Sequence, residues 1–406
     1  MFRSAETLAR HGRFDPKRKE LDRLGIDRVP SGWTLSTVGS ACAIRNELRL
    51  PISVEERNEI PGPYPYYGPT GHLSSIDHFR INGEFALIGE DGDHFMEPFT
   101  KNQTLLIRGK FNVNNHAHVI GSGAMCSVKW FFYFYHHRDI SHSLTRQGAG
   151  RFKLTKAALE QLPILLPPLP EQEKIAEILR TWDEAVEKLE ALRTVKTQQF
   201  EGVAACLINT AVAEPQHLRE HLSEVSERNR GKCVDRILSV TNSAGFVLAE
   251  DQFAYRVASA DISNYKIVRQ GQYAYNPSRI NVGSIARLDD WSEGALSPMY
   301  VVFEVRDTLD ADYFGHWLRS GEARKRIALA AQGSVRDTVS FGDLSSILIP
   351  LPSLNEQQRI ARTLSTLKDE LTLLDREIKA ITRQKRGLMQ KLLTGEWRVN
   401  ELEAAA

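Results

Sequence analysis

Apolar residues near the end of the chain recur at alternating steps of four and three. This heptad pattern continues over four repeats, with Lys385 at the one position that lacks an apolar side chain. It predicts a long helix from Glu356 to Leu393, roughly 57 Å in length at 1.5 Å per residue. The positions that make the pattern are Ile360, Leu364, Leu367, Leu371, Leu374, Ile378, Ile381, Leu388 and Leu392.

Residues on either side of this pattern indicate where the helix begins and ends. Pro350 and Pro352 exclude a helix before it, because proline lacks the amide that a helix interior requires. Asn355 is placed to cap the helix, with Gln358 three residues later in capping-box position. Gly395 is the expected stop, since glycine readily adopts the left-handed conformation that ends many helices.

A second copy of this helix lies earlier in the chain. Residues 166–179 match residues 351–364 at eight of 14 positions, with an offset of 185 residues. The same offset pairs Gln147 with Gln332, Arg151 with Arg336, Gly202 with Gly387 and Leu207 with Leu392. One register held over about 60 positions indicates a tandem duplication. Pro170 is placed to open the first helix.

The segments before the two helices, about residues 30–162 and 214–347, have the pattern of α+β domains. Short β-prone runs such as Phe85–Ile88 and Tyr300–Phe303 alternate with Gly, Pro and Asn. The two segments resemble each other only weakly, so two different heads are mounted on one duplicated helix. We divide the chain into a leader (1–29), a first head (30–165), a first helix (166–212), a second head (213–350), a second helix (351–400) and a tail (401–406).

One apolar seam per helix is enough to bury the two helices against each other. We therefore expect an α+β protein with two heads separated by an antiparallel coiled coil and related by a pseudo-two-fold axis. A generic helical hairpin or a homodimer zipper is the alternative. The duplicated head-plus-helix arrangement favours pairing within the chain.

Composition narrows the class of protein. The formal net charge is only +1, which counts against a chain that grips DNA alone, because phosphate neutralisation dominates the affinity of many DNA-binding proteins. The four cysteines form no CxxC pair, which fits a reducing cytosol and argues against a zinc ribbon. No apolar run approaches the length needed to span a bilayer.

No catalytic or metal signature stands out in the sequence. There is no Walker A pattern, and Asn276-Pro277 is followed by Ser278 rather than by the second proline of an amino-methyltransferase motif. The histidine pairs at 116/118 and 136/137 have no carboxylate or cysteine at a matching helical spacing. We therefore predict neither a catalytic site nor a metal site in this chain.

The arrangement resembles the specificity subunit of type I restriction–modification systems. The most specific motifs are Leu-Pro-Pro-Leu-Pro-Glu-Gln-Glu-Lys-Ile-Ala at 166–176, its copy at 351–361, and Leu-Met-Gln-Lys-Leu-Leu-Thr-Gly at 388–395. Residues 64–71, 87–92 and 113–119 are similar to parts of that family's target-recognition domains. The likeness covers nearly the whole chain except residues 1–28.

This resemblance implies a function and partners. Each head would be a target-recognition domain that reads one half of a bipartite, asymmetric site in double-stranded DNA, and the helices would set the spacing. Two copies of a methyltransferase subunit would dock on the helices, and restriction subunits would join. The resemblance also implies a cytoplasmic complex, with S-adenosylmethionine, Mg²⁺ and ATP held by partner subunits and no cofactor in this chain.

Polar side chains on loops of the heads are the candidates for DNA contact, because base readout needs donors and acceptors that reach the groove floor. The Pro/Gly-rich stretch around 64–71 is expected to be a loop, and Arg151 and Arg336 are matched across the repeat. In the first head the candidates are Tyr64, Tyr66, Tyr67, Thr70, Gly71, Asn112, Asn115, His116 and Arg151. In the second head they are Tyr275, Asn276, Arg279, Asn281 and Arg336.

The helix starts supply candidates for partner binding. Glu171, Gln172, Glu356 and Gln357 occupy matched positions where head, helix and partner would meet. The alternative reading is simple helix N-terminal charge, since Glu there favours the helix dipole. For the chain as a whole, the alternative to DNA recognition is a coiled-coil scaffold that only drives oligomerisation.

Overall fold

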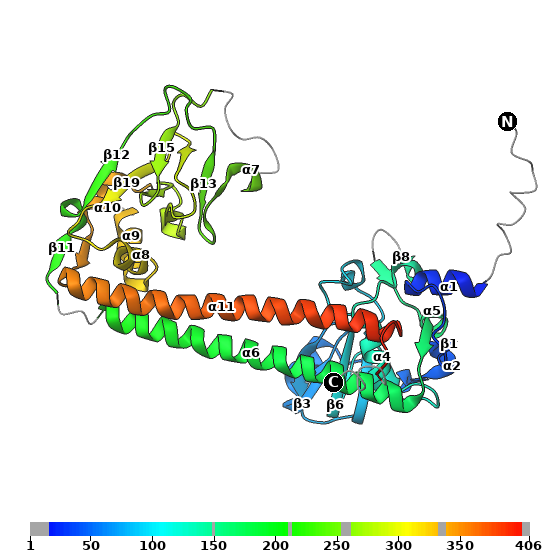
Figure 1. The fold of residues 1–406 in the computed structure, drawn as a ribbon. Helices are drawn as coiled ribbons and strands as arrows, with labels where there is room; N and C mark the ends of the chain where they lie inside the picture. The colour runs from blue at the N-terminus through cyan, green and yellow to red at the C-terminus, as the bar shows by residue number, and fades with distance from the viewer. Residues whose placement is uncertain (1–15, 148–150, 210–212, 253–260, 332–337, 400–406) are drawn as a thin grey trace, which may run out of the picture. The chain divides into compact units, whose positions relative to one another are not determined.

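Two long helices, α6 (Leu169–Asn209) and α11 (Leu354–Leu393), are the largest elements of the computed structural model (Figure 1). The structure describes residues 16–147, 151–209, 213–252, 261–331 and 338–399. It divides into unit 1, residues 1–188 with 378–406, and unit 2, residues 189–377. Each unit therefore contains one head and one part of each long helix.

The two helices pair in antiparallel fashion, as the sequence predicts. In unit 1, Ile175 and Leu179 near the start of α6 share a core with Leu392 near the end of α11. In unit 2, Leu207 near the end of α6 packs in one core with Leu364 near the start of α11. Ion pairs flank the seam in unit 2, where Arg193 contacts Asp375 at 2.6 Å and Lys196 contacts Glu370 at 2.9 Å.

Two of the three helix-end signals read from the sequence agree with the structure. Pro170 lies in the first turn of α6, where no backbone donor is needed, and Gly395 has a φ of +70° just after α11. The capping box at Asn355 is wrong: α11 begins at Leu354, and the backbone N–H of Gln357 donates to the Ser353 carbonyl at 2.9 Å.

Lys385 occupies its seam position as the buried half of a partly exposed ion pair. The side chain is 11% exposed, and Nζ contacts Oδ1 of Asp183 on α6. The other carboxylate oxygen of Asp183 accepts a hydrogen bond of 2.8 Å from the Tyr133 hydroxyl of the head. The Asp183 carboxylate thus joins both helices and the head in unit 1.

The head of unit 1 contains a six-stranded sheet in the order β2-β7-β5-β6-β3-β4. These strands are β2 (Ala43–Ile44), β7 (Ala117–Gly121), β5 (Ile81–Gly89), β6 (Thr104–Val113), β3 (Pro61–Tyr67) and β4 (His72–Ile76). Helix α4 (Val128–Tyr135) packs on β5 and β6. A separate antiparallel pair, β1 (Thr34–Thr37) with β10 (Pro163–Leu166), leads directly into α6.

The head of unit 2 follows the same plan near its helix and a different one farther away. The pair β11 (Pro215–His217) and β20 (Leu348–Pro350) leads into α11, and helix α8 (Ala311–Leu318) occupies the place of α4. The main sheet has only four strands, in the order β12 (Leu222–Val225), β19 (Val301–Val305), β16 (Tyr273–Tyr275) and β17 (Ile285–Arg287). Two further antiparallel strand pairs complete this head: the hairpin of β13 (Leu238–Thr241) with β14 (Gly245–Leu248), and β15 (Lys266–Arg269) with β18 (Glu293–Leu296).

The duplication extends to the hydrogen bonds that join head and helix. Buried Gln172 accepts the backbone N–H of Ser127, the N-cap of α4, at 2.9 Å, and donates to the Pro167 carbonyl at 2.8 Å. Buried Gln357 accepts the N–H of Asp310, the N-cap of α8, at 2.8 Å, and donates to the Pro352 carbonyl at 2.9 Å.

Within the residues that the structure describes, every helix is too short or too polar to cross a bilayer. The antiparallel helix pair with two α+β heads confirms the fold class expected from the sequence.

The Asp183–Lys385 pair predicts that a double substitution costs less stability than a single one. Asp183→Asn should lower the free energy of unfolding by roughly 2–3 kcal/mol, because it leaves a buried ammonium without its counter-charge. Asp183→Leu combined with Lys385→Leu should recover most of that loss, since apolar residues then complete the seam. Urea denaturation of the full chain measures both, and a double variant less stable than Asp183→Asn would contradict the account.

Candidate nucleic-acid interface

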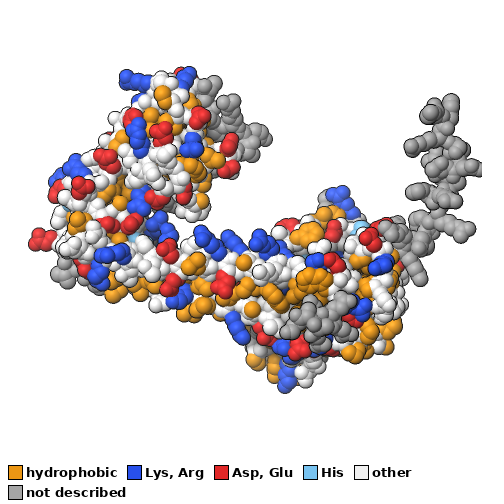
Figure 2. Space-filling model, in the orientation of Figure 1, with side chains coloured by type: hydrophobic (Ala, Val, Ile, Leu, Met, Phe, Trp, Pro, Cys, Tyr) orange, Lys and Arg blue, Asp and Glu red, His pale blue; other side chains and the backbone are white. Residues whose placement is uncertain are grey.

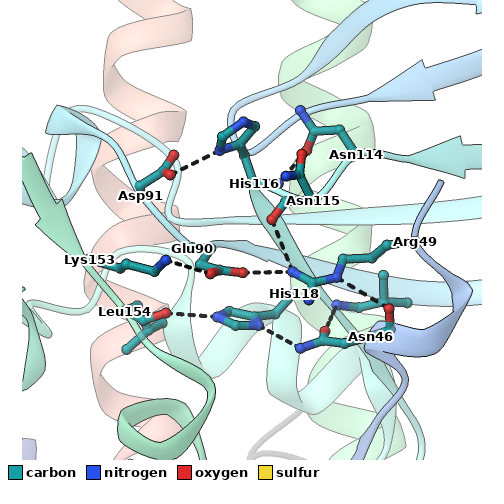
Figure 3. A network of polar contacts seen from close by, with 11 residues as sticks. Asn46, Arg49, Glu90, Asp91, Asn114, Asn115, His116, His118, Lys153 and Leu154 are labelled. Carbon is teal, nitrogen blue, oxygen red and sulfur yellow. Dashed lines mark hydrogen bonds and ion pairs between the residues drawn. The ribbon is translucent and has the colours of Figure 1, made fainter. Parts of the chain in front are cut away.

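A polar network lies beneath the surface of the first head, at the end of β5 (Figure 3). The Glu90 carboxylate accepts a hydrogen bond from Arg49 Nη1 at 2.6 Å and pairs with Lys153 Nζ at 3.0 Å. Arg49 Nη1 also donates to the Asn115 carbonyl at 3.0 Å. These bonds tie the segment after β5 to the turn between β6 and β7.

His118 fixes the floor of this network. Its Nε2 donates to the Leu154 carbonyl at 2.8 Å, and its Nδ1 accepts from Asn46 Nδ2 at 2.9 Å (Figure 3). The Asn46 side-chain oxygen in turn accepts the N–H of Val119 at 3.1 Å. Burial lowers the pKa of His118, so the ring is neutral at neutral pH and serves as a structural bridge.

The turn above this floor presents Asn115 and His116 to solvent. Its shape is held by Asn114, whose side-chain oxygen accepts the N–H of His116 at 2.9 Å. The His116 ring lies 2.9 Å from an Asp91 carboxylate oxygen (Figure 3). Asp91 can stand there because Gly92 follows with a φ of +137°, which a side chain rarely tolerates. The result is a rigid polar edge on the head.

The charge of Glu90 is maintained by its two cations. Burial acts to raise the pKa of this carboxyl, but the hydrogen bonds from Arg49 and Lys153 outweigh it, and the pKa lies below its usual value of 4.5.

The Tyr-rich stretch of the first head is mostly strand, so the predicted loop is wrong. Tyr66 lies in β3, is fully buried, and donates from its hydroxyl to the Leu50 carbonyl at 2.6 Å. The alternation of aromatic and proline residues fits a strand with one buried face. The Pro and Gly content led the sequence analysis to predict a loop instead. Tyr64 packs against Phe79, and Tyr67 packs against Phe111 and His72. Of the candidates in this stretch, Thr70 and Gly71 lie in the turn before β4, with Thr70 exposed.

Asn112 has an internal role. It is fully buried in β6, accepts the N–H of Arg80 at 2.9 Å and donates to the His78 carbonyl at 2.8 Å. Its side chain therefore holds the strand edge in place and does not reach the surface.

The second head forms a cleft of about 940 Å³ with α11, all within unit 2. Figure 2 shows the surface hollowed where this head meets the long helix. Charged residues of both signs line it, and Arg287 contacts Asp289 at 2.6 Å and Asp312 at 2.8 Å. Its cations are Arg287, Arg319, Arg324 and Lys368; its uncharged polar residues include Thr241, Asn242, Ser243, Asn281, Ser365 and Thr372.

The sequence candidates of the second head divide into buried and exposed residues. Tyr275 is fully buried and donates to the Val339 carbonyl at 3.2 Å, and Asn276 is buried and accepts the N–H of Ser278 at 3.0 Å. Arg279 and Asn281 are exposed, and Asn281 lines the cleft. The two buried residues shape the turn that carries the two exposed ones.

Neither side chain of the matched arginines lies in the part of the chain that the structure describes. Arg151 begins strand β9 (Arg151–Lys153), but its side chain is outside the described residues, and all of Arg336 is. Their contact with a ligand stays a prediction.

The four helix-start residues differ in environment. Glu171 is 14% exposed and accepts hydrogen bonds from Trp33 Nε1 at 3.1 Å and from Arg398 Nε at 2.9 Å. Glu356 is partly exposed and pairs with Arg359 at 2.6 Å. Gln172 and Gln357 are buried in the head–helix junction. Their role towards a partner stays a prediction, and the structure gives three of the four an internal role.

Several residues of the Glu90 network and of the cleft were not predicted from the sequence. Arg49 and Lys153 come together with Glu90 only through the fold, and no spacing links Arg287 and Arg319 to Lys368 on α11. Among the described residues, no three His, Cys, Asp or Glu side chains gather in a way that could hold a metal ion.

Comparison with known proteins gives a consistent result. The model of a family described as the type I restriction modification DNA specificity domain matches residues 30–197 and 257–383. The chain is 22% identical to a type I restriction enzyme specificity subunit of Methanocaldococcus jannaschii over 92% of this chain and 95% of that protein. It is 29% identical to a putative type I restriction enzyme specificity subunit of Haemophilus influenzae, over 46% of this chain and only 45% of that protein.

A solved structure has the same fold. The S subunit of a type I restriction-modification system from M. genitalium aligns with a TM-score of 0.61 at 15% identity. The alignment covers 90% of this chain and 96% of that one.

The Glu90 network predicts an acid-dependent effect on stability. Because the folded pKa is depressed, the ion pairs contribute fully above about pH 4.5 and are lost as the pH falls through the folded value. Glu90→Gln should lower the Tm by roughly 2–4 °C at pH 7, the shift expected for about 1 kcal/mol, and by less at pH 4.

Thermal unfolding of the full chain at both pH values measures this difference. Glu97→Gln, which removes an exposed carboxylate paired with Lys101, is the matched control and should change the Tm little. An equal effect of Glu90→Gln at pH 7 and pH 4 would refute the assignment.

Proposed function

The chain belongs to the family of type I restriction modification DNA specificity domains, and on that premise we propose that it is the DNA-recognition subunit of a type I restriction–modification complex. Each head reads one half of a bipartite site in double-stranded DNA. The two half-sites differ in sequence because the two heads differ.

The observation that carries this proposal is the family match to both repeats. The structure supports it in a second way: the helix starts and the Gln172 and Gln357 junctions are alike, whereas the sheets beyond them have six and four strands. A scaffold that only drives oligomerisation has no need for two different heads. The scaffold alternative is therefore not favoured.

Exposed polar residues at the turns of the heads are the proposed base contacts. In the first head these are Asn115 and His116, which stand on the Glu90 network. In the second head they are Asn281, which lines the cleft, and Arg279 on the same turn. An arginine at such a turn can donate two hydrogen bonds to guanine O6 and N7, the commonest specific contact in the major groove.

The long helices are proposed to set the distance between the half-sites and to bind methyltransferase subunits. A helix of 40 residues is about 60 Å long, and half-sites on one face of DNA recur every ~34–36 Å. Exposed charged residues flank the seam of both helices, as in coiled coils that pack against further chains.

The chemistry of modification and cleavage belongs, in this proposal, to partner subunits. S-adenosylmethionine, Mg²⁺ and ATP are assigned to the methyltransferase and restriction subunits. This chain contributes binding and orientation, and we propose no catalytic role for it.

A methylation map of the host genome tests the proposal and its residues together. Cells with the gene should methylate an asymmetric, bipartite motif that is absent from cells without it. Arg279→Ala should relax the second half-site only, at a cost of about 1–3 kcal/mol for the lost guanine contact.

The control is His116→Ala, which should alter only the first half-site. Identical maps with and without the gene would refute the recognition function. Loss of both half-sites with either variant would refute independent reading.

A second experiment tests the helices as a spacer. Seven residues inserted after Lys188 in α6 and after Glu377 in α11 preserve the heptad seam and lengthen each helix by about 10 Å. The gap between half-sites should grow by about three base pairs at ~3.4 Å each. Insertion in α6 alone breaks the pairing and should abolish methylation, and an unchanged gap in the double insertion would contradict the spacer role.

A further inference from the structure

The last part of α11 is the most one-sidedly charged segment of either long helix. Residues 378–393 contain five Lys or Arg and no Asp or Glu. The preceding residues of the same helix, 354–377, contain four basic and five acidic residues. The α6 residues of unit 1, 169–188, contain three basic and six acidic residues. Because the whole chain has a net charge of only +1, the excess of positive charge in residues 378–393 is confined to this segment.

Two of the five cations are neutralised within the chain. Lys385 is buried against Asp183, and Lys391 pairs with Glu396. The other three, Lys379, Arg383 and Arg386, are exposed, and among the described residues no carboxylate forms an ion pair with them. We call these three residues the basic stripe.

The basic stripe occupies one face of the helix. Steps of four and then three residues place the three side chains on one line along α11, because these are the spacings of neighbours on a helix surface. Figure 2 shows lysine and arginine side chains gathered along one edge of the long helices. Inside unit 1, the stripe ends beside the first head, near His137. Burial is the main cause of the lowered pKa of His137, and the charges of Arg386 and Lys385 lower it further.

The surroundings of the stripe fit a polyanion better than a protein. Protein interfaces have apolar or aromatic centres that are depleted in charge. Here the exposed residues of the same stretch are Gln384, Gly387 and Gln390. A cationic, polar surface without exposed apolar residues matches the phosphate backbone, which interfaces with DNA contact mainly through Arg and Lys.

The dimensions also fit a duplex. The seven residue steps from Lys379 to Arg386 rise about 10 Å along the helix axis. Double-stranded DNA carries one charge per ~1.7 Å, so about six phosphates lie along that length. Three flexible cations in a row can each reach one of them.

We propose that the basic stripe of α11 binds the DNA backbone in the unread gap between the two half-sites. This inference rests on the proposed function, in which one duplex is read by both heads. Phosphate contact there adds affinity that is independent of sequence and reconciles DNA binding with the near-neutral charge of the chain.

Salt-dependent DNA binding by the complex of the full chain with its methyltransferase subunit tests this proposal. The probes are two duplexes of equal length, one with the host's methylated motif and one without. The variant Lys379→Gln, Arg383→Gln, Arg386→Gln should reduce the slope of log K against log salt by about 2.7, and the affinity at 0.1 M salt on the order of 100-fold, for both duplexes.

Two further variants serve as controls. Lys101→Gln, Arg108→Gln, Lys156→Gln removes the same charge from cations of unit 1 that already pair with carboxylates, and should leave the slope nearly unchanged. The charge-preserving variant Lys379→Arg, Arg383→Lys, Arg386→Lys should bind as wild type does.

The outcomes separate this inference from the proposed function. An unchanged slope in the stripe variant overturns the inference. If the slope is unchanged and the stripe variant no longer binds the methyltransferase subunit, the stripe is assigned to that protein partner instead. If the wild-type complex does not prefer the duplex with the motif, the proposed function fails. The slope on the other duplex still decides the role of the stripe in that case.

Discussion

The antiparallel seam of α6 and α11 is the interaction on which the rest of the structure depends. Each head is attached to the first turns of one helix and lies against the final part of the other in the same unit. Burial of the apolar faces therefore stabilises helix and head at once. The Asp183–Lys385 pair favours one register of the two helices, because the buried Lys385 charge meets its partner only in that register.

The seam was also the part of the fold that sequence could predict best. Periodicity at Ile360, Leu364 and the following positions depends on one helix alone, and the duplication supplied the second helix. The predicted N-cap at Asn355 was wrong because α11 already begins at Leu354. Helix boundaries read from sequence are uncertain by one or two residues, and the preceding prolines favoured the later start. Buried Gln172 and Gln357 could not be recognised as junction residues, since their partners lie 45 and 47 residues away.

The heads were predicted less well, and for a physical reason. Of the aromatic and amide candidates, Tyr66, Asn112, Tyr275 and Asn276 are buried, where their hydrogen bonds fix strands and turns. The same residue types serve buried hydrogen bonding and surface contact, and only burial separates the two uses. Asn115, His116, Arg279 and Asn281, chosen by type and position, are exposed, and their contact with DNA stays a prediction. The Arg49–Glu90–Lys153 network could be found only from the fold.

Unit 1 is built from both ends of the described chain. Leu24 and Trp33 share one core with Leu392 and Val399, and Arg398 returns to Glu171 at the start of α6. Unit 2, by contrast, is one continuous stretch of sequence. During synthesis on the ribosome, the last residues of unit 2 therefore emerge before Met389, Leu392 and Val399, which belong to the core of unit 1. The core of unit 1 is thus completed only after all of unit 2 has been synthesised, although the head of unit 1 emerges first.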